Sequence, residues 1–185
     1  MKQPSLVILD RDGVINEDSV DYIKDADEWL PIPGSLEAIA KLSAKKVPVA
    51  IATNQAGIGR GLFDEYSLAR IHARMIEAIE DAGGRIELIA FCPHHPDDAC
   101  ECRKPKPGLL FTISEELAIS LEDAVIIGDS KKDIEAGRAA GTAAQYLVLT
   151  GKGADEREKF SSDMPPVFAD LAAAVDHLLD GPASE

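Results

Sequence analysis

The chain has few basic residues, few cysteines and no long hydrophobic run. Lys and Arg number 19 against 33 Asp and Glu, which leaves a formal net charge of −14 across 185 residues. This balance argues against nucleic acid or an anionic membrane surface as the main partner. No stretch approaches the roughly 18 apolar residues that a membrane-spanning helix requires. Residues 1–4 lack an apolar signal segment, so we expect a cytoplasmic location.

The three cysteines are clustered in one short segment. Cys92, Cys100 and Cys102 lie within eleven residues, and an odd number fits poorly with a disulfide framework. Cys92 with His94, and Cys100 with Cys102, form two i, i+2 pairs. Three thiolates and one imidazole suit a tetrahedral zinc site of structural type. His95 is the competing ligand, although the matching spacing favours His94, and the alternative to zinc is a set of free surface thiols.

Short apolar runs alternate with amphipathic segments along the chain. Such alternation predicts an α/β fold, a Rossmann-like three-layer sandwich with a central parallel sheet. The predicted strands cover residues 6–9, 47–52, 88–91, 124–127 and 146–149, and the predicted helices cover 35–46, 64–82, 110–117, 134–140 and 171–179. The polar residues 152–163 are predicted to form a loop.

The length and the spacing of the strands predict a single domain over residues 1–185. A chain of this length is long enough to bury one hydrophobic core. Only 43 positions separate Asp10 from Thr53, and 51 separate Thr53 from Lys104. One crossover helix and its loops largely fill each interval, so we expect no inserted cap domain.

Two aspartates follow the first apolar run. Asp10 and Asp12 come directly after residues 6–9 and precede Gly13. Ligands bind beyond the carboxyl ends of the strands in open α/β sheets, so the pair is placed to bind a cation or act on a substrate. The alternative reading of the same residues is a turn that Asp10 begins and Asp12-Gly13 completes.

All but the last of the predicted strands end in polar residues. Thr53 precedes a glycine-rich segment, residues 57–61. The Thr53 hydroxyl and the backbone amides of that segment suit phosphate oxygens, although a flexible loop is the alternative interpretation of the segment. Asp129 follows the fourth run and could complete a magnesium site with Asp10. Asp133 and Ser130 also fit a capping box at the start of the next helix.

A basic cluster, residues 103–108, lies between the third strand and the next helix. Lys104 there could neutralise phosphate charge, and Arg103 could bind another anionic group bidentately. A solvated basic loop is the usual interpretation of such a cluster. Its place in the sequence nevertheless allows it to face the same edge of the sheet as the strand-end residues.

These strand-end groups occur in an order that resembles the four motifs of the haloacid dehalogenase (HAD) superfamily of phosphotransferases: Asp10 with Asp12, then Thr53, Lys104, and Asp129 with Asp133. The resemblance runs from about residue 6 to residue 141. It implies that Asp10 attacks phosphorus and forms an aspartyl-phosphate. It also implies that Asp12 protonates the leaving alcohol and then deprotonates water, while Thr53 and Lys104 hold the phosphoryl oxygens.

The same resemblance implies a magnesium ion bound by Asp10, Asp12 and Asp129, with Asp133 and Ser130 beside it. The cation is required by electrostatics as well, because two carboxylates would otherwise repel a dianionic phosphate. We therefore expect Mg²⁺ and Zn²⁺ as cofactors and a small phosphorylated sugar as substrate, and we expect the chain to be a monomer.

The cysteine segment, Cys-Pro-His-His through Cys-Glu-Cys-Arg-Lys-Pro-Lys-Pro-Gly, resembles that of the D,D-heptose 1,7-bisphosphate phosphatases. That branch removes the 7-phosphate of the heptose bisphosphate used in lipopolysaccharide core or surface glycan synthesis. The histidinol-phosphate phosphatases share this loop and are the alternative. The resemblance implies substrate contacts from Asn54, Gln55, Arg60, Arg103 and Tyr22.

Two departures from that branch concern the rim of the site. The loop between His94 and Cys100 is short, and residues 19–22 read Ser-Val-Asp-Tyr where His-Gly-Tyr is usual.

A receiver-type phospho-acceptor domain is the alternative of another class. It would place its acceptor aspartate after the third strand, where this chain has Cys92.

Overall fold

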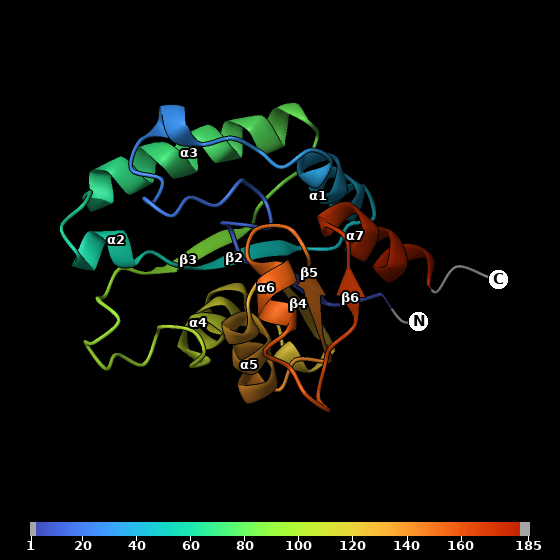
Figure 1. Ribbon diagram of the computed structural model, residues 1–185. Coiled ribbons are helices and arrows are strands. Elements are labelled where there is room, and N and C mark those ends of the chain that lie inside the picture. Colours follow the sequence, from blue (N-terminus) through green and yellow to red (C-terminus); the bar gives the residue numbers. More distant parts are fainter. Residues whose placement is uncertain (1–2, 182–185) are drawn as a thin grey trace.

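The structure, a computed structural model, describes residues 3–181. Within these residues the strands form one parallel, six-stranded sheet in the order β3-β2-β1-β4-β5-β6 (Figure 1). The strands are β1 Leu6–Leu9, β2 Val49–Asn54, β3 Leu88–Cys92, β4 Ala124–Gly128, β5 Ala144–Val148 and β6 Val167–Phe168. The helices are α1 Ser35–Ala44, α2 Ala56–Gly59, α3 Glu65–Asp81, α4 Gly108–Leu117, α5 Lys131–Ala140, α6 Gly153–Arg157 and α7 Leu171–Asp180.

The central position of β1 determines where the site lies. β1 pairs with β2 on one side and with β4 on the other, so the strand order reverses between β1 and β4. In open α/β sheets this reversal opens a crevice beyond the carboxyl ends of the strands, where ligands bind. The residues that follow β1 and β4 are therefore brought together in that crevice.

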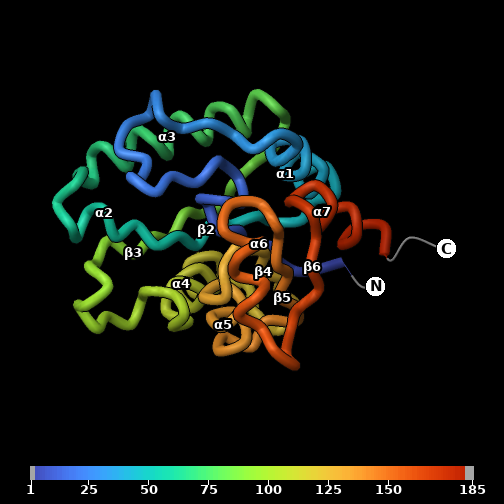
Figure 2. The backbone as a smooth tube through the Cα atoms, in the orientation of Figure 1, coloured from blue at the N-terminus to red at the C-terminus, as the bar shows by residue number. Residues whose placement is uncertain are grey.

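Two apolar layers enclose the sheet, in agreement with the three-layer prediction. Alternate strand residues such as Leu9 and Ile51 pack beneath α1, α3 and α7, while Ile8 and Ala52 pack against α4 and α5 on the other face. Figures 1 and 2 show these helices on opposite sides of the sheet. Successive strand side chains point to opposite faces, so each buried strand contributes to both layers.

Helix starts are fixed by side chains that the sequence supplies at the expected positions. The carboxylate of Asp64 accepts a hydrogen bond from the Ser67 N–H at the start of α3, and Asp170 has the same role at α7. Ser130 and Asp133 form a capping box at α5, as the sequence predicted. α5 therefore starts immediately after β4 and holds Asp133 close to the strand end.

The structure also contains elements that were not predicted, including α2, which lies in the glycine-rich segment after Thr53. β6 was not predicted, because its two residues are too short to show an alternating pattern. The segment 152–163, predicted as a loop, contains the five-residue helix α6. Its sequence, Gly-Ala-Asp-Glu-Arg, has too few apolar residues to produce a helical period. Among residues 3–181, no helix has both the length and the apolar character needed to cross a membrane.

Candidate active site

The carboxyl ends of β1, β2 and β4 open into one pocket with a volume of about 430 Å³. Most of the residues that the sequence nominated for catalysis and substrate binding line it, together with residues of two flanking loops. The nominated residues in its lining are Asp10, Asp12, Tyr22, Thr53, Asn54, Gln55, Arg103, Asp129 and Ser130, and the others include Arg11, Asp18, Ser19, Val20, Ile23, Lys132, Lys152 and Glu156.

Three carboxylates gather on the floor of this pocket. Asp10, Asp129 and Asp133 each offer an oxygen atom, and these atoms lie within 4.8 Å of one another. Burial and the nearby Asp133 raise the pKa of Asp10 to about 7. Burial and Asp10 likewise raise the pKa of Asp129 to about 8. These carboxylates resist being ionised at the same time, because their charges repel one another. Their oxygen atoms form the donor set that a hard divalent cation prefers.

Lys104 supplies the positive charge nearest to these carboxylates. Its Nζ lies 3.1 Å from Oδ1 of Asp10 and 2.6 Å from Oδ1 of Asp133, and it donates to the carbonyl of Ala52 at 2.6 Å. The side chain is 2% exposed. Burial opposes its charge, but the attraction of Asp10 and Asp133 outweighs burial and raises the pKa of Lys104. The lysine is therefore a fixed cation directly behind Asp10, although it is not itself among the residues that line the pocket.

Asn54 holds Lys104 in place through its backbone. The Asn54 amide donates from Nδ2 to the Lys104 carbonyl and accepts from the Lys104 N–H at Oδ1, both at 3.1 Å. These two bonds attach the basic segment to the end of β2. The sequence predicted a substrate contact for Asn54, and in the structure its amide group is already engaged with Lys104.

Asp12 has a separate set of partners. Its carboxylate accepts two bonds from the Arg11 Nη2, at 2.8 and 3.0 Å, and one each from Asn16 at 3.0 Å and Gln55 at 2.9 Å. The Gln55 amide also donates to Oγ1 of Thr53 at 2.9 Å. Although burial acts in the opposite direction, the Arg11 guanidinium and these hydrogen bonds lower the pKa of Asp12.

The observed carboxylate cluster therefore differs in one member from the predicted magnesium ligands. The sequence assigned Asp12 to the ion, whereas the acidic group of the described residues contains Asp133 in its place. The Asp133 carboxylate accepts from the Ser130 N–H and hydroxyl and also pairs with Lys104. Asp133 therefore both caps α5 and belongs to the carboxylate group of the site.

The loop after β5 completes the surroundings of Asp129, and the sequence analysis did not find it. A Cβ atom at Gly13 or Gly151 would lie 2.1 or 2.2 Å from Oδ2 of Asp129. Both glycines have positive φ, 81° and 58°. Thr150 donates its hydroxyl to the Gly13 carbonyl at 2.6 Å, and the Lys152 N–H donates to Asp129 at 2.8 Å. The available signal was Thr150-Gly151 directly after the fifth apolar run.

An ion pair and an unpaired guanidinium nitrogen also belong to the pocket lining. Lys152 forms an ion pair with Asp18, at 2.9 Å, that joins the loop after β5 to the loop after β1. Among the described residues, Nη1 of Arg103 is buried without a hydrogen-bond partner. A buried guanidinium nitrogen without an acceptor is suited to receive one from a ligand. Arg60, also predicted to bind substrate, is exposed at the end of α2 and does not line the pocket.

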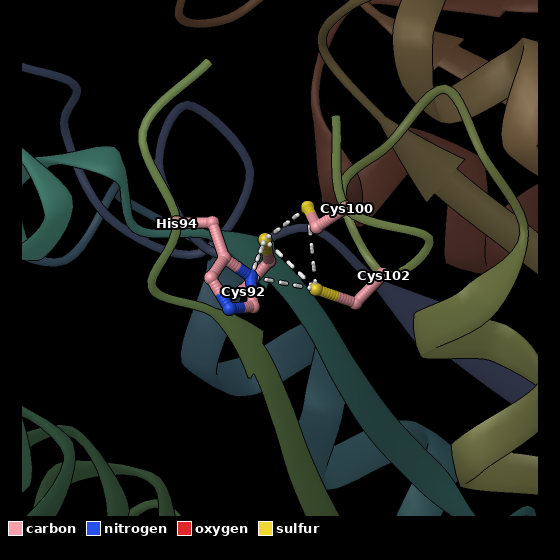
Figure 3. A group of neighbouring side chains, drawn as sticks. All are labelled: Cys92, His94, Cys100 and Cys102. Carbon is pink, nitrogen blue, oxygen red and sulfur yellow. Dashed lines mark hydrogen bonds between the residues drawn. The ribbon is translucent and has the colours of Figure 1, made fainter. Parts of the chain in front are cut away.

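The four predicted zinc ligands come together in the structure (Figure 3). The three sulfur atoms lie 3.0 to 3.6 Å apart, and Nδ1 of His94 is 3.2 Å from Sγ of Cys102. A tetrahedral ion with Zn–S bonds of about 2.3 Å separates its sulfur ligands by about 3.8 Å, which two of these three distances approach. His95, the competing ligand, instead accepts a hydrogen bond from the Asp97 N–H.

The segment that carries the cysteine–histidine group is packed against the end of α2. A Cβ atom at Gly59 would lie 2.3 Å from the backbone nitrogen of His95, so the two segments touch along their backbones. Figure 2 shows the segment between β3 and α4 extending past the end of the sheet beside α2. Cys102 is followed directly by Arg103 and Lys104, so the group fixes the start of the basic segment.

Comparison with known proteins gives consistent relationships over nearly the whole chain. A model of the HAD-hydrolase-like family matches residues 101–174. A Pseudomonas aeruginosa protein named D-glycero-beta-D-manno-heptose-1,7-bisphosphate 7-phosphatase is 51% identical, over 95% of this chain and 98% of that protein. A Bordetella bronchiseptica protein of the same name is 44% identical, over 94% of this chain and 97% of that protein.

The fold has a similarly close match. The crystal structure of D,D-heptose 1,7-bisphosphate phosphatase from Bordetella bronchiseptica, complexed with magnesium and phosphate, has a TM-score of 0.92 to this chain at 43% identity. The match covers 96% of this chain and 99% of that one. That crystal structure thus contains both the cation and the anion that the pocket residues described above are suited to bind.

The raised carboxyl pKa values predict how stability depends on pH. The pKa is about 7 for Asp10 and about 8 for Asp129, against an ordinary 3.8, so the folded chain retains protons that the unfolded chain has released. The free energy of unfolding then falls as pH rises toward 8. His72, with a pKa lowered to about 4 from 6.5, contributes the opposite slope only below pH 6.5.

We therefore expect the melting temperature in magnesium-free buffer, with zinc retained, to fall between pH about 6.5 and about 8, and magnesium to raise it most at the upper end. Asp129→Asn should weaken both effects, because one of the two raised carboxyls is removed. Differential scanning calorimetry at several pH values provides the measurement. A magnesium effect that does not change with pH would contradict this account.

Proposed function

The chain belongs to the HAD-like hydrolase family, in the branch of the heptose-1,7-bisphosphate 7-phosphatases, and on that premise we propose that it removes the 7-phosphate of D-glycero-beta-D-manno-heptose 1,7-bisphosphate. The observation that carries the substrate assignment is Arg103, which lines the pocket and whose Nη1 is buried without a partner. Asp10 on the floor, with Lys104 behind it, is suited to the reacting phosphate. Arg103 is then available for the second phosphate.

Asp10 is the nucleophile in this proposal. Its Oδ1 accepts from the Arg11 N–H at 2.7 Å and faces Lys104 at 3.1 Å, which leaves Oδ2 to attack. A bond forms between Oδ2 and phosphorus as the bond to the sugar oxygen breaks. Asp10 and Asp129 would hold a magnesium ion, which would supply the positive charge that neutralises the phosphate and favours the ionised nucleophile. Thr53 and Lys104 hold the phosphoryl oxygens.

Asp12 transfers the protons in both half-reactions. It first gives a proton to the leaving sugar oxygen, and the dianionic phosphate beside it favours the protonated form needed for that step. It then takes a proton from the water that attacks the aspartyl-phosphate. The lowered pKa of Asp12 suits it to this second step. The covalent intermediate divides one large barrier into two smaller ones.

The proposal also covers the assembly and the environment of the enzyme. We infer one domain over residues 1–185, supported by the single sheet that spans residues 6–168. The clustered cysteines, a donor set for zinc and not a disulfide pattern, support a reducing, cytoplasmic environment. We also propose that the chain is a monomer, which its compact core and closed cysteine–histidine loop allow.

A histidinol phosphatase remains the alternative among phosphatases. Its substrate has a single phosphate, which would leave the Arg103 nitrogen without a phosphate partner. The receiver-type alternative is weaker, because β3 ends at Cys92, whose sulfur belongs to the cysteine–histidine group. A receiver domain requires an aspartate at that strand end.

The first test compares the two phosphatase substrates. We expect magnesium-dependent phosphate release with a kcat/KM at least about tenfold higher for the heptose bisphosphate than for histidinol phosphate, because a charged hydrogen bond contributes about 1.5–3 kcal/mol. Asp10→Asn should abolish turnover of both. A preference for histidinol phosphate would reverse the substrate assignment, and turnover by Asp10→Asn would remove Asp10 as the nucleophile.

The second test concerns Arg103. Arg103→Gln should lower kcat/KM for the bisphosphate by about ten- to a hundredfold, while activity on heptose 7-phosphate changes little, because only the bisphosphate offers a second anionic group. Arg74→Gln, which changes an exposed arginine on α3, is the matched control and should leave both activities unchanged. Equal losses on the two substrates would show that Arg103 does not recognise the second phosphate.

The third test concerns zinc. We propose one zinc ion at Cys92, His94, Cys100 and Cys102, so elemental analysis should find about one equivalent per chain. Cys100→Ser should reduce the zinc content and the melting temperature. His95→Ala, which changes the neighbouring histidine, should retain the full metal content. A full complement of zinc in Cys100→Ser, or its loss in His95→Ala, would refute the assignment.

A further inference from the structure

Arg11, between the two aspartates, is a buried cation that orients Asp12. Its side chain is 1% exposed. Nε donates to Oδ1 of Asp12 at 3.0 Å, and Nη2 donates to both carboxylate oxygens at 2.8 and 3.0 Å. This geometry fixes the plane of the carboxylate relative to that of the guanidinium. Asn16 and Gln55 also donate to this carboxylate, so the orientation of Asp12 depends in part on what fixes the other edge of Arg11.

His72 on α3 occupies that other edge. Its Nε2 lies 3.3 Å from Nη1 of Arg11. A guanidinium can only donate, so Nε2 is the acceptor and the ring proton is on Nδ1. Burial and the charge of Arg11 lower the pKa of His72 to about 4, so the ring is neutral at neutral pH and able to accept.

The histidine ring is in turn held by the sheet. The ring of Phe91 meets it edge to face, with centroids 6.1 Å apart and planes at 66°. Phe91 lies on β3, pairs in register with Thr53 and precedes Cys92. An edge-to-face contact of this kind is favourable, so it supports the ring position in which Nε2 faces Arg11. A continuous line of contacts therefore connects β3 to Asp12 through Phe91, His72 and Arg11.

We propose that His72 is a positioning residue for proton transfer, which acts by holding Arg11 so that Asp12 faces the substrate. The inference rests on the proposed phosphatase function. Without the acceptor on α3, the guanidinium of Arg11 can rotate about its Cδ–Nε bond. The Asp12 carboxylate that it binds would then be displaced as well. Small displacements of a proton-transfer group lower the rate of chemistry more than they lower the affinity for substrate.

The experiment compares substitutions that keep or remove the acceptor. His72→Leu removes it and should lower kcat about tenfold while KM stays within about twofold. His72→Gln keeps a carbonyl oxygen of similar reach and should retain most of kcat. His177→Leu is the matched control, since His177 is a half-buried histidine packed against Tyr146 and Phe168, away from the pocket, and should leave kcat unchanged.

A double-mutant cycle separates positioning from packing. If His72 acts through Arg11, then His72→Leu should lower kcat little further in an Arg11→Lys background. Loss of packing alone would reduce the melting temperature of His72→Leu without this dependence on Arg11. If His72→Leu does not fold, His72→Asn, whose amide is too short to reach Nη1, replaces it in the cycle.

Several outcomes would overturn the proposal. These are an unchanged kcat in His72→Leu, an equal loss in His72→Gln, or independent losses in the double variant. The proposed function fails in a different way, because the unsubstituted enzyme would then release no phosphate from the heptose bisphosphate. Measuring that enzyme first distinguishes the two failures.

Discussion

The site depends on the repulsion among three buried carboxylates. Asp10, Asp129 and Asp133 place oxygen atoms within 4.8 Å of one another where the strand order reverses. Burial, together with a repulsion that Lys104 offsets only in part, raises the pKa values of Asp10 and Asp129. A divalent cation supplies the remaining charge and provides an attraction for phosphate. The same repulsion that opposes folding without the metal is what makes the site selective for a cation.

This balance requires Lys104 to remain in one place. Contacts on both sides of Lys104 in its loop hold it there. Lys104 lies on an irregular segment between β3 and α4, where few backbone bonds would otherwise fix it. Asn54 attaches its backbone to β2, and the group ending in Cys102 fixes the chain just before it. A structural zinc ion there would contribute to catalysis indirectly, because it would immobilise the segment that carries Arg103 and Lys104.

Strand-end chemistry was predictable from the sequence because a parallel sheet brings the carboxyl ends of its strands together. Asp10, Thr53 and Asp129 line one pocket, as this rule predicts, and Lys104 lies directly behind Asp10. The rule failed where position depends on tertiary contact. The loop after β5 has no charged motif at its start, yet Thr150 and Gly151 enclose Asp129. Arg60 was nominated from a motif, but its exposure depends on how α2 packs.

The two aspartates of the first motif show how surroundings divide two roles between identical side chains. They are two residues apart, yet burial among carboxylates raises the pKa of Asp10 while Arg11 helps to lower that of Asp12. Cation binding changes the charge balance around Asp10 directly. Asp12 keeps its own partners, Arg11, Asn16 and Gln55, and is not a member of the carboxylate cluster. Metal activation and proton transfer can therefore be altered separately by substitution.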